Sequence, residues 1–275
     1  MNAAVIGANG FLGRNLVSAL MEKGFNVLAL YNNNNDQIPQ DCTQIPVTRI
    51  DKIPLITDYL FITIGNHALD KKAFDAQREF LSATLKKISF QKVIYVSSVA
   101  VYGAHGDVIT EESSFNSPSV YGLAKIAEEE VILQQKEYAV VRFTYLYGAG
   151  MDHNSLLPKW CKQAKQTKTI SVYGDGSRKQ DYLEVSDAAQ LLIAAALRNG
   201  NGIWNGATGI SVSNKEVAAE VAANIEGTTI EFVNEDKAPS FFYDIKKVKT
   251  DLNWQPRVVF KAGIKNMIEH DLADL

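Results

Sequence analysis

The sequence has no long hydrophobic run, few cysteines and little excess charge. No apolar stretch approaches the ~20 residues that a membrane-spanning helix needs, so we expect no membrane segment. The net charge of −3 argues against nucleic acid as the main partner, because phosphate binding depends on clustered lysine and arginine. The two cysteines, Cys42 and Cys161, lie far apart and form no CxxC pair, so we expect reduced thiols in a cytoplasmic protein.

Signals for secretion and for metal binding are also missing. The N-terminus has no basic region followed by an apolar segment, so we expect no signal peptide. The four histidines show no HExxH or Cys/His ligand spacing, so we expect no metal. What is present is an ordinary globular composition, 46% hydrophobic and 21% charged. The 275 residues allow one large domain or a domain and a half.

The first half of the chain alternates short β-branched runs with helical patterns. The predicted strands are Ala3–Ile6, Asn26–Tyr31, Tyr59–Ile64, Lys92–Ser97 and Ala139–Tyr145. The predicted helices begin at Phe11, span Asp70–Lys87 and span Tyr121–Lys136. Continuously apolar strands are typical of parallel sheets that are covered on both faces. Residues 1–148 are therefore predicted to form an α/β domain, a Rossmann-type doubly wound parallel sheet that binds a dinucleotide.

The character of the sequence changes after Gly148. Glycine, proline and short helical patterns dominate, with one longer helix expected over Ser186–Arg198. We predict that residues 149–275 form mostly a smaller C-terminal substrate-binding lobe. Some segments of this part are expected to return and extend the first sheet.

A glycine-rich turn follows the first strand and opens the first helix. Gly7, Gly10 and Gly13 form a GxxGxxG pattern. Glycine permits positive φ and close backbone approach, and the helix N-terminus offers N–H groups and a positive dipole end to a pyrophosphate. This strand–turn–helix context predicts a dinucleotide site, with a tight turn that binds no ligand as the alternative.

The residues after the second strand bear on the choice of cofactor. NAD sites usually place an acid there to hold the ribose hydroxyls, but this chain has Asn32, and the first acid is Asp36. An amide would not repel a 2′-phosphate, so we expect NADP(H) rather than NAD(H). Arg14 is either a partner for that phosphate or a solvated helix charge. Asp51 is either an acceptor for the adenine amino group or an ordinary turn aspartate.

A phenol and an ammonium stand four residues apart at Tyr121 and Lys125, on one helix face. A nearby cation lowers the pKa of a phenol from its usual ~10, which suits it as an acid or base for an alcohol–ketone couple. The spacing recurs at Tyr243 and Lys247, so context must decide between the pairs. Context favours Tyr121, because a serine pair at 97–98 ends a predicted strand, where the site of an open α/β sheet lies.

Six motifs occur in an order that resembles one known family. They are GANGFLG at 7–13, SSVAVYG at 97–103, YGLAK at 121–125, RFTYLYGAG at 142–150, YGDGSRKQDYLEVSDAA at 173–189 and LNWQP at 252–256. Over nearly its whole length the chain resembles the extended short-chain dehydrogenase/reductases. Within them it resembles the NAD-dependent epimerase/dehydratase group that acts on nucleotide sugars.

The resemblance implies a set of site residues and an assembly. Ser98 matches the catalytic serine or threonine, Tyr121 the acid/base, and Lys125 both a ribose ligand and a modulator of the pKa of Tyr121. The implied cofactor contacts are Gly7, Asn9, Gly10, Phe11, Leu12, Gly13, Asn32, Asp51, Ile64, Tyr121 and Lys125. Many relatives are homodimers formed through the two helices predicted over 70–87 and 121–136, so a homodimer is expected.

Several positions depart from the family pattern. Tyr145 replaces the asparagine that usually contacts substrate, and Gln180 replaces the arginine that clamps the substrate diphosphate. Arginine suits that task because its fork binds phosphate oxygens bidentately. Either Arg178 or Lys179 takes its place here, or the substrate is held differently or is not a nucleotide sugar. Leu157 fits the substrate-lobe helix. Ser98, Tyr145, Leu157, Arg178 and Gln180 are the expected substrate contacts.

Three functions stay open. The first is reduction of a 4-keto nucleotide sugar by NADPH, which the missing ribose acid favours. The second is a nucleotide-sugar 4-epimerase that keeps one NAD bound. The third is a regulatory protein that binds NADP(H) without turnover, although such relatives often lose the tyrosine or lysine, and both are kept here.

Overall fold

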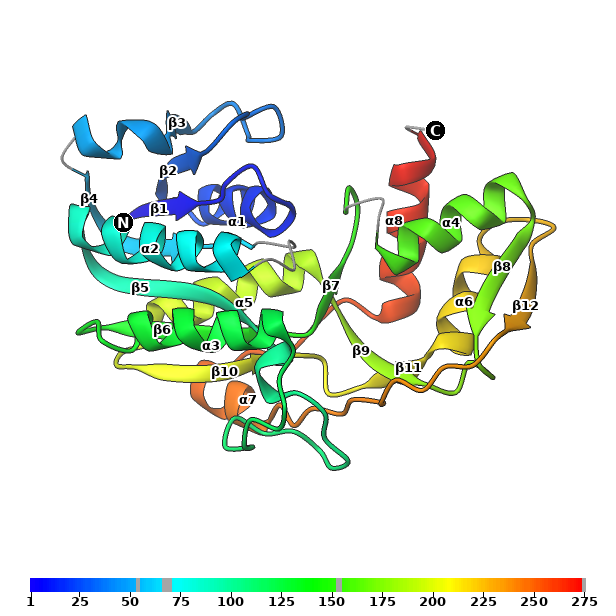
Figure 1. Cartoon of the computed structure of the whole chain (residues 1–275). Coiled ribbons are helices and arrows are strands. Elements are labelled where there is room, and N and C mark those ends of the chain that lie inside the picture. The colour runs from blue at the N-terminus through cyan, green and yellow to red at the C-terminus, as the bar shows by residue number, and fades with distance from the viewer. Residues whose placement is uncertain (53–54, 66–70, 152–154, 274–275) are drawn as a thin grey trace.

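A computed structural model describes residues 1–52, 55–65, 71–151 and 155–273. Its centre is a sheet of seven parallel strands in the order β10-β6-β5-β4-β1-β2-β3 (Figure 1). The strands are β1 (Asn2–Ile6), β2 (Asn26–Tyr31), β3 (Thr43–Pro46), β4 (Leu55–Ile62), β5 (Ile88–Ser98), β6 (Tyr138–Phe143) and β10 (Gly202–Gly206). The strand order reverses between β1 and β4, and ligands of open α/β sheets bind in the crevice at such a point.

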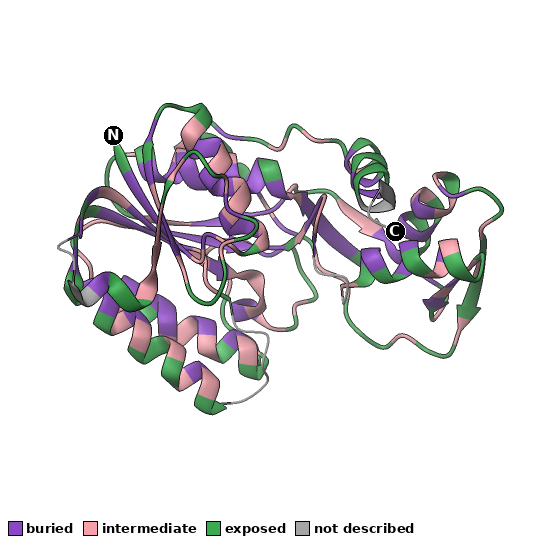
Figure 2. Cartoon of the chain, turned by 90° about the horizontal axis from the view of Figure 1, so that it is seen from above, coloured by how far each residue is buried: buried purple, intermediate pink, exposed green. Residues whose placement is uncertain are grey.

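Helices cover both faces of this sheet (Figures 1 and 2). Helices α1 (Phe11–Glu22) and α5 (Val185–Leu197) pack together on one face, and α2 (Lys71–Lys87) and α3 (Val120–Ile132) pack together on the other. Strand residues alternate between the two layers, so Val5 joins the first core while Ala4 and Ile6 join the second. The expected Rossmann-type doubly wound fold is therefore confirmed.

The smaller lobe lies beyond the carboxyl ends of the strands. It contains α4 (Leu156–Gln166), β8 (Thr169–Tyr173), α6 (Asn214–Ala223), β12 (Thr229–Val233) and α8 (Phe260–Ala273), which enclose a core of their own. A three-stranded sheet of β7 (Tyr145–Tyr147), β9 (Lys179–Glu184) and β11 (Ser211–Ser213) joins the lobes. The remaining elements are η1 (Val47–Lys52), η2 (Val99–Tyr102) and α7 (Lys246–Leu252).

Several predicted boundaries were wrong, and tertiary contacts explain the clearest case. The run Ala139–Tyr145 is two strands, because the chain leaves the central sheet at Thr144 to pair with β9. Thr144 bonds to both parts, through its N–H to Gly206 O (3.1 Å) and its hydroxyl to Asp181 O (2.8 Å). Helix α3 ends at Ile132 rather than at residue 136, and β4 spans Leu55–Ile62 rather than 59–64. Asp70, the predicted start of α2, lies outside the described residues.

The second half of the chain contributes to the central sheet. Strand β10 pairs in parallel with β6 at the edge of that sheet. The division of the chain at residue 148 remains a prediction. In the described part of the chain, no helix combines the length and the apolar character that crossing a membrane requires.

Candidate active site

The glycine-rich turn is built so that helix α1 approaches the strand ends closely. Gly7 has a φ of +88°, and a Cβ there would lie 2.8 Å from Thr63 Oγ1. A Cβ on Gly13 would lie 2.0 Å from the Gly7 carbonyl oxygen, which no side chain could tolerate. Helix α1 begins at Phe11 without a side-chain cap and without an acid in its first turn. Its first N–H groups are thus presented as a pyrophosphate requires, and these residues fit a dinucleotide.

The loop after β2 folds back onto this turn. The Asn9 amide donates to Asn34 Oδ1 (2.9 Å) and to Asp36 Oδ1 (3.0 Å), while Gln37 N–H donates to Asn9 Oδ1 (2.9 Å). Asn32 is exposed at the end of β2. A carboxylate, that of Asp36, therefore lies at the glycine turn, four residues after Asn32.

Three further residues were predicted from the sequence to lie near the dinucleotide. Arg14 donates to the Gly150 carbonyl and stacks over Phe11 at 5.7 Å from the ring centroid, so its guanidinium is occupied within the protein. Asp51 lies in η1, and its side chain falls outside the described part of the structure. Ile64 follows β4, and its carbonyl oxygen accepts a long contact of 3.4 Å from Lys125 Nζ. The roles of these residues in cofactor binding remain predictions.

Ser98 and Tyr121 come together at the carboxyl end of β5. The Ser98 hydroxyl accepts from Ala100 N–H (3.2 Å), and Ser98 and Tyr121 line the same pocket. Gly122 makes this approach possible, because a Cβ there would lie 2.3 Å from the Ala100 carbonyl oxygen. Burial raises the pKa of Tyr121, the hydrogen bond from Ser98 lowers it, and the Glu128 carboxylate raises it further.

Lys125 lies one turn along α3 and is only 3% exposed. Its Nζ donates to Tyr95 Oη (2.8 Å) and to Glu128 Oε2 (3.0 Å). Burial lowers the pKa of Lys125, while Glu128 opposes that effect. The second YxxxK pair has no such geometry, because Lys247 points to the Ile203 carbonyl (2.8 Å) and to Asp251 (3.4 Å).

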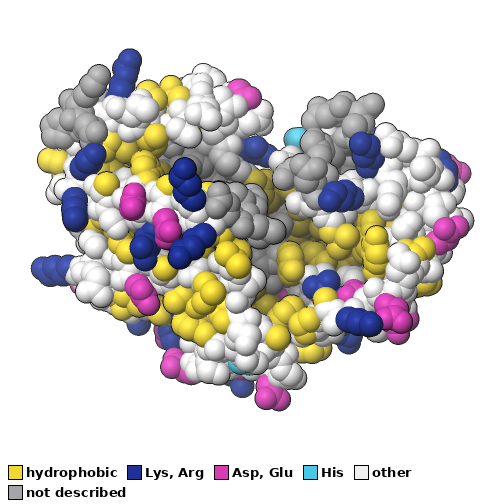
Figure 3. Space-filling model, viewed as in Figure 1, with side chains coloured by type: hydrophobic (Ala, Val, Ile, Leu, Met, Phe, Trp, Pro, Cys, Tyr) yellow, Lys and Arg dark blue, Asp and Glu magenta, His cyan; other side chains and the backbone are white. Residues whose placement is uncertain are grey.

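A pocket of about 440 Å³ opens beside Ser98 and Tyr121. Its wall carries aromatic rings and small hydroxyls, contributed by Phe143, Tyr145, Phe241, Tyr243, Ser117, Ser119 and Thr144. Figure 3 shows the molecule hollowed between the two lobes, with hydrophobic side chains along the smaller lobe. Tyr145 is 49% exposed and packs against Tyr182, so the residue that departs from the family pattern does face the pocket.

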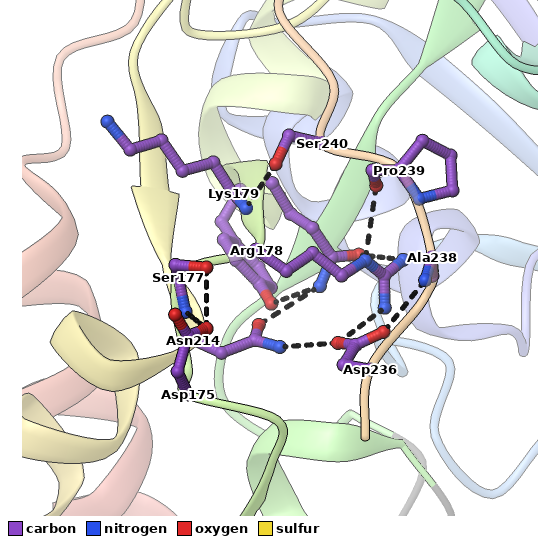
Figure 4. A network of polar contacts seen from close by, with 11 residues as sticks. Asp175, Ser177, Arg178, Lys179, Asn214, Asp236, Ala238, Pro239 and Ser240 are labelled. Carbon is purple, nitrogen blue, oxygen red and sulfur yellow. Dashed lines mark hydrogen bonds and ion pairs between the residues drawn. The ribbon is translucent and has the colours of Figure 1, made fainter.

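The remaining substrate candidates are Arg178 and Gln180 at β9, and Leu157 in α4; Figure 4 shows Arg178 among its polar partners. The Arg178 guanidinium faces Asp236 Oδ2 (3.9 Å) and donates to the Pro239 carbonyl (3.2 Å). Gln180 is 3% exposed and donates to Tyr182 Oη (3.2 Å) and to Asn214 Oδ1 (3.4 Å). Leu157 is 1% exposed in the core of the smaller lobe. The contacts of these side chains with substrate remain predictions.

Sequence reasoning missed two groups of residues here. Phe241 and Tyr243 reach the pocket from far along the chain, because Phe241 N–H pairs with the Lys179 carbonyl (3.1 Å). No local pattern marks that contact. Glu128 and Tyr95 were also missed, although the spacing of Lys125 and Glu128 by three residues on a helix was a usable signal.

The comparisons with known proteins agree with this geometry. The family model for the NAD dependent epimerase/dehydratase family matches residues 3–58 and 66–207. A putative UDP-glucose 4-epimerase of Methanocaldococcus jannaschii is 26% identical to this chain, in an alignment that covers 96% of each of the two chains. The crystal structure of a UDP-glucose 4-epimerase with UDP-glucose from Thermotoga maritima superposes with a TM-score of 0.88 at 21% identity, over 100% of this chain and 99% of that one. A UDP-glucuronic acid 4-epimerase from Bacillus cereus, solved with UDP-glucuronic acid and NAD, gives 0.86 at 18% identity over 100% of both chains.

This fold and this Ser, Tyr and Lys arrangement define an extended short-chain dehydrogenase/reductase. The chain belongs to the NAD dependent epimerase/dehydratase family, and it is an enzyme of the NAD(P)-dependent oxidoreductase or epimerase type. The resemblance on which the sequence prediction rested is thus confirmed.

Proposed function

We propose that this enzyme catalyses reversible hydride transfer at C4 of the sugar in a nucleotide-diphosphate sugar. The observation that carries the proposal is that Ser98 and Tyr121 line the same pocket of about 440 Å³, one helical turn from the buried Lys125. A bound dinucleotide supplies or accepts the hydride. Tyr121 moves the hydroxyl proton, Ser98 donates a hydrogen bond to the same sugar oxygen, and the Lys125 ammonium favours the phenolate.

Of the two catalytic forms, the 4-epimerase with retained NAD is the one we propose first. Asp36 lies against Asn9 at the glycine turn, where its carboxylate would repel a 2′-phosphate and could accept from ribose hydroxyls. This observation favours NAD(H), against the expectation of NADP(H) from Asn32. The relatives named as 4-epimerases support the same choice. Net reduction of a 4-keto sugar by NADPH is the second candidate, favoured by the exposed amide of Asn32 at the strand end.

The first test is to denature the purified protein and identify the dinucleotide that it releases. About one NAD per chain supports the epimerase, because that reaction returns the hydride to the same sugar. A protein that releases nothing and then binds NADPH better than NADH supports the reductase. Asp36→Asn should weaken NAD binding and improve NADP binding, and Asp41→Asn on the same connection is the matched control.

Catalysis itself is tested with Tyr121→Phe. We expect turnover of UDP-glucose or of a 4-keto nucleotide sugar to fall at least about a hundredfold, with dinucleotide affinity kept, because only the proton donor is removed. The regulatory alternative predicts that this variant behaves like the wild type. Unchanged turnover in Tyr121→Phe would refute the proposed roles of all three residues.

The substrate diphosphate is proposed to bind Arg178, with Tyr145 stacking near the sugar. Arg178 is partly exposed at the start of β9, and the adjoining segment carries Phe241 into the pocket. Gln180, by contrast, is buried and bonded to its neighbours, so the diphosphate clamp of this enzyme differs from the family pattern at that position. Leu157 supports the lobe from inside its core.

We also propose a homodimer formed through α2 and α3. Most of the side chains of α2 that the sequence could not divide between core and interface are turned to the sheet, since Leu81 and Leu85 are buried in its core and Phe80 packs against that core. Phe74 is buried against Tyr121 of α3 instead. The outer face of α3 instead exposes Val120 (52%) and Leu123 (55%). Sedimentation velocity should give twice the chain mass, and Leu123→Glu should halve it. Cytoplasmic location stays a prediction.

A further inference from the structure

A buried carboxylate lies directly beneath the catalytic lysine. Glu128 is 2% exposed and Lys125 is 3% exposed, and their Oε2 and Nζ atoms lie 3.0 Å apart on successive turns of α3. Burying two charges is expensive unless both are well paired, so this ion pair has to be held by further contacts. The YGLAK motif ends at Lys125 and therefore says nothing about Glu128.

Two other elements of the fold hold this carboxylate in place. The Tyr95 hydroxyl, from β5, donates to Glu128 Oε2. The Gln77 amide, from α2, donates to Glu128 Oε1 (2.6 Å). Both carboxylate oxygens thus have partners, from a strand and from a neighbouring helix, and the group has no room to turn away from Lys125.

The three N–H donors of the Lys125 ammonium are not equally engaged. Two make short contacts, to Tyr95 Oη (2.8 Å) and to Glu128 Oε2 (3.0 Å). The remaining contacts are long, at 3.4 Å to the carbonyl oxygens of Ile64 and Val96. Hydrogen bonds of N–H to oxygen are usually ~2.7–3.2 Å, so the third donor is weakly held and is aimed at the ends of β4 and β5.

We propose that Glu128 is a positioning residue that keeps Lys125 protonated and aims its third N–H toward the site of the dinucleotide. This inference rests on the proposed function, in which the Lys125 charge favours the Tyr121 phenolate. The inference adds Glu128, a residue outside the YGLAK motif, as the group on which the charge of Lys125 depends.

The electrostatics of the cluster support this role. Burial lowers the pKa of Lys125, and the Glu128 carboxylate raises it again. The other titratable groups at the cluster are Tyr121 and Tyr95, whose pKa values burial raises, and Glu129, which Arg142 of β6 engages at 2.7 Å. Without Glu128 the lysine would be an isolated buried cation, and such a group releases its proton at lower pH.

The decisive experiment follows the lysine directly, apart from activity. The full-length protein is labelled with ¹³Cε-lysine, and the Lys125 resonance is assigned by its loss in Lys125→Met. We expect Glu128→Gln to lower the titration midpoint of that resonance by about one pH unit or more, because the counter-charge is removed with the shape kept. Glu130→Gln, on the exposed face of the same helix, should leave the midpoint unchanged.

A second readout connects the charge to ligand binding. NAD affinity of Glu128→Gln should match the wild type at the acidic end and fall about tenfold above the lowered midpoint, while the wild type holds its affinity there. In the Lys125→Met background, Glu128→Gln should add no further loss. If Glu128→Gln does not fold, Glu128→Asp, which withdraws the carboxylate by one methylene, should shift the midpoint in the same direction by less.

The outcomes separate this inference from the proposed function. A wild-type titration midpoint in folded Glu128→Gln overturns the inference, even if Tyr121→Phe is inactive. A lowered midpoint together with a fully active Tyr121→Phe leaves Glu128 as the group that keeps Lys125 charged and refutes the proposed function instead.

Discussion

Replacing Glu129 by glutamine tests how the active-site helix is attached to the central sheet. Glu129 and Arg142 are 3% and 4% exposed and form a bidentate pair, with Nε to Oε1 at 3.0 Å and Nη2 to Oε2 at 2.7 Å. The Ser97 hydroxyl donates to the same carboxylate. The pair therefore joins α3 to both β5 and β6.

The expected loss of stability follows from the charge of Arg142, which Glu129→Gln leaves without its partner. An amide accepts at only one atom, and its NH₂ group faces the guanidinium, so Arg142 becomes a buried cation without a counter-charge. Breaking one side of a buried pair costs about 3–5 kcal/mol. That is a large share of the ~5–15 kcal/mol by which domains are stable, so we expect Glu129→Gln to fold only marginally.

The assay is urea unfolding at neutral pH, followed by circular dichroism. We expect the midpoint to fall strongly at constant slope, while Glu130→Gln on the exposed face changes stability by less than about 0.5 kcal/mol. The double variant Glu129→Met/Arg142→Met should recover much of the loss, because no buried charge remains. A loss below about 1 kcal/mol in Glu129→Gln would show that the pair does not secure α3, and the reasoning would be refuted.

Two further predictions concern the smaller lobe. Arg178→Gln should raise the KM for a nucleotide sugar about tenfold or more with kcat nearly unchanged. Asp236→Asn should lower that KM, because a competing carboxylate 3.9 Å from Arg178 is removed. Lys237→Gln, at an exposed lysine beside Asp236, is the matched control, and equal KM values in all three variants would contradict the role of Arg178. Asp181 is fully buried, and burial raises its pKa from 3.8 to about 6 despite hydrogen bonds from Thr208. The folded state thus binds more protons than the unfolded state between these values, so this group should reduce stability by about 3 kcal/mol as pH rises from below 4 to above 6. Asp181→Asn does not titrate, so its loss of stability relative to the wild type should be smaller at pH 7 than at pH 4. Chemical denaturation at both pH values measures these losses. A larger loss at pH 7 would contradict the predicted pH dependence.

Local sequence patterns predicted much of the fold and of the candidate site. The strand Asn26–Tyr31 was predicted with the bounds that the structure has, because its apolar run lies between Gly24, just after α1, and the asparagines that follow Tyr31. The glycine pattern was also readable, and at Gly13 the need for glycine arises within the turn, from the Gly7 carbonyl oxygen. At Gly7 it arises from the φ of +88° and also from Thr63, which belongs to a distant segment. Such features depend mainly on backbone sterics and on the spacing of hydrophobic residues, which are properties of short segments.

The tertiary structure decided the features that depend on distant segments. The pairing of Tyr95 and Gln77 with Glu128, the arrival of Phe241 at the pocket, and the return of Asp36 to the glycine turn join residues that are 27 or more positions apart or lie on different elements. No periodicity specifies which side chain meets which across such gaps. By itself the sequence determined the class of fold and the residue types of the reaction. Folding determined which charges are buried beside them, because burial and the partners that offset it exist only once the sheet and its helices have packed.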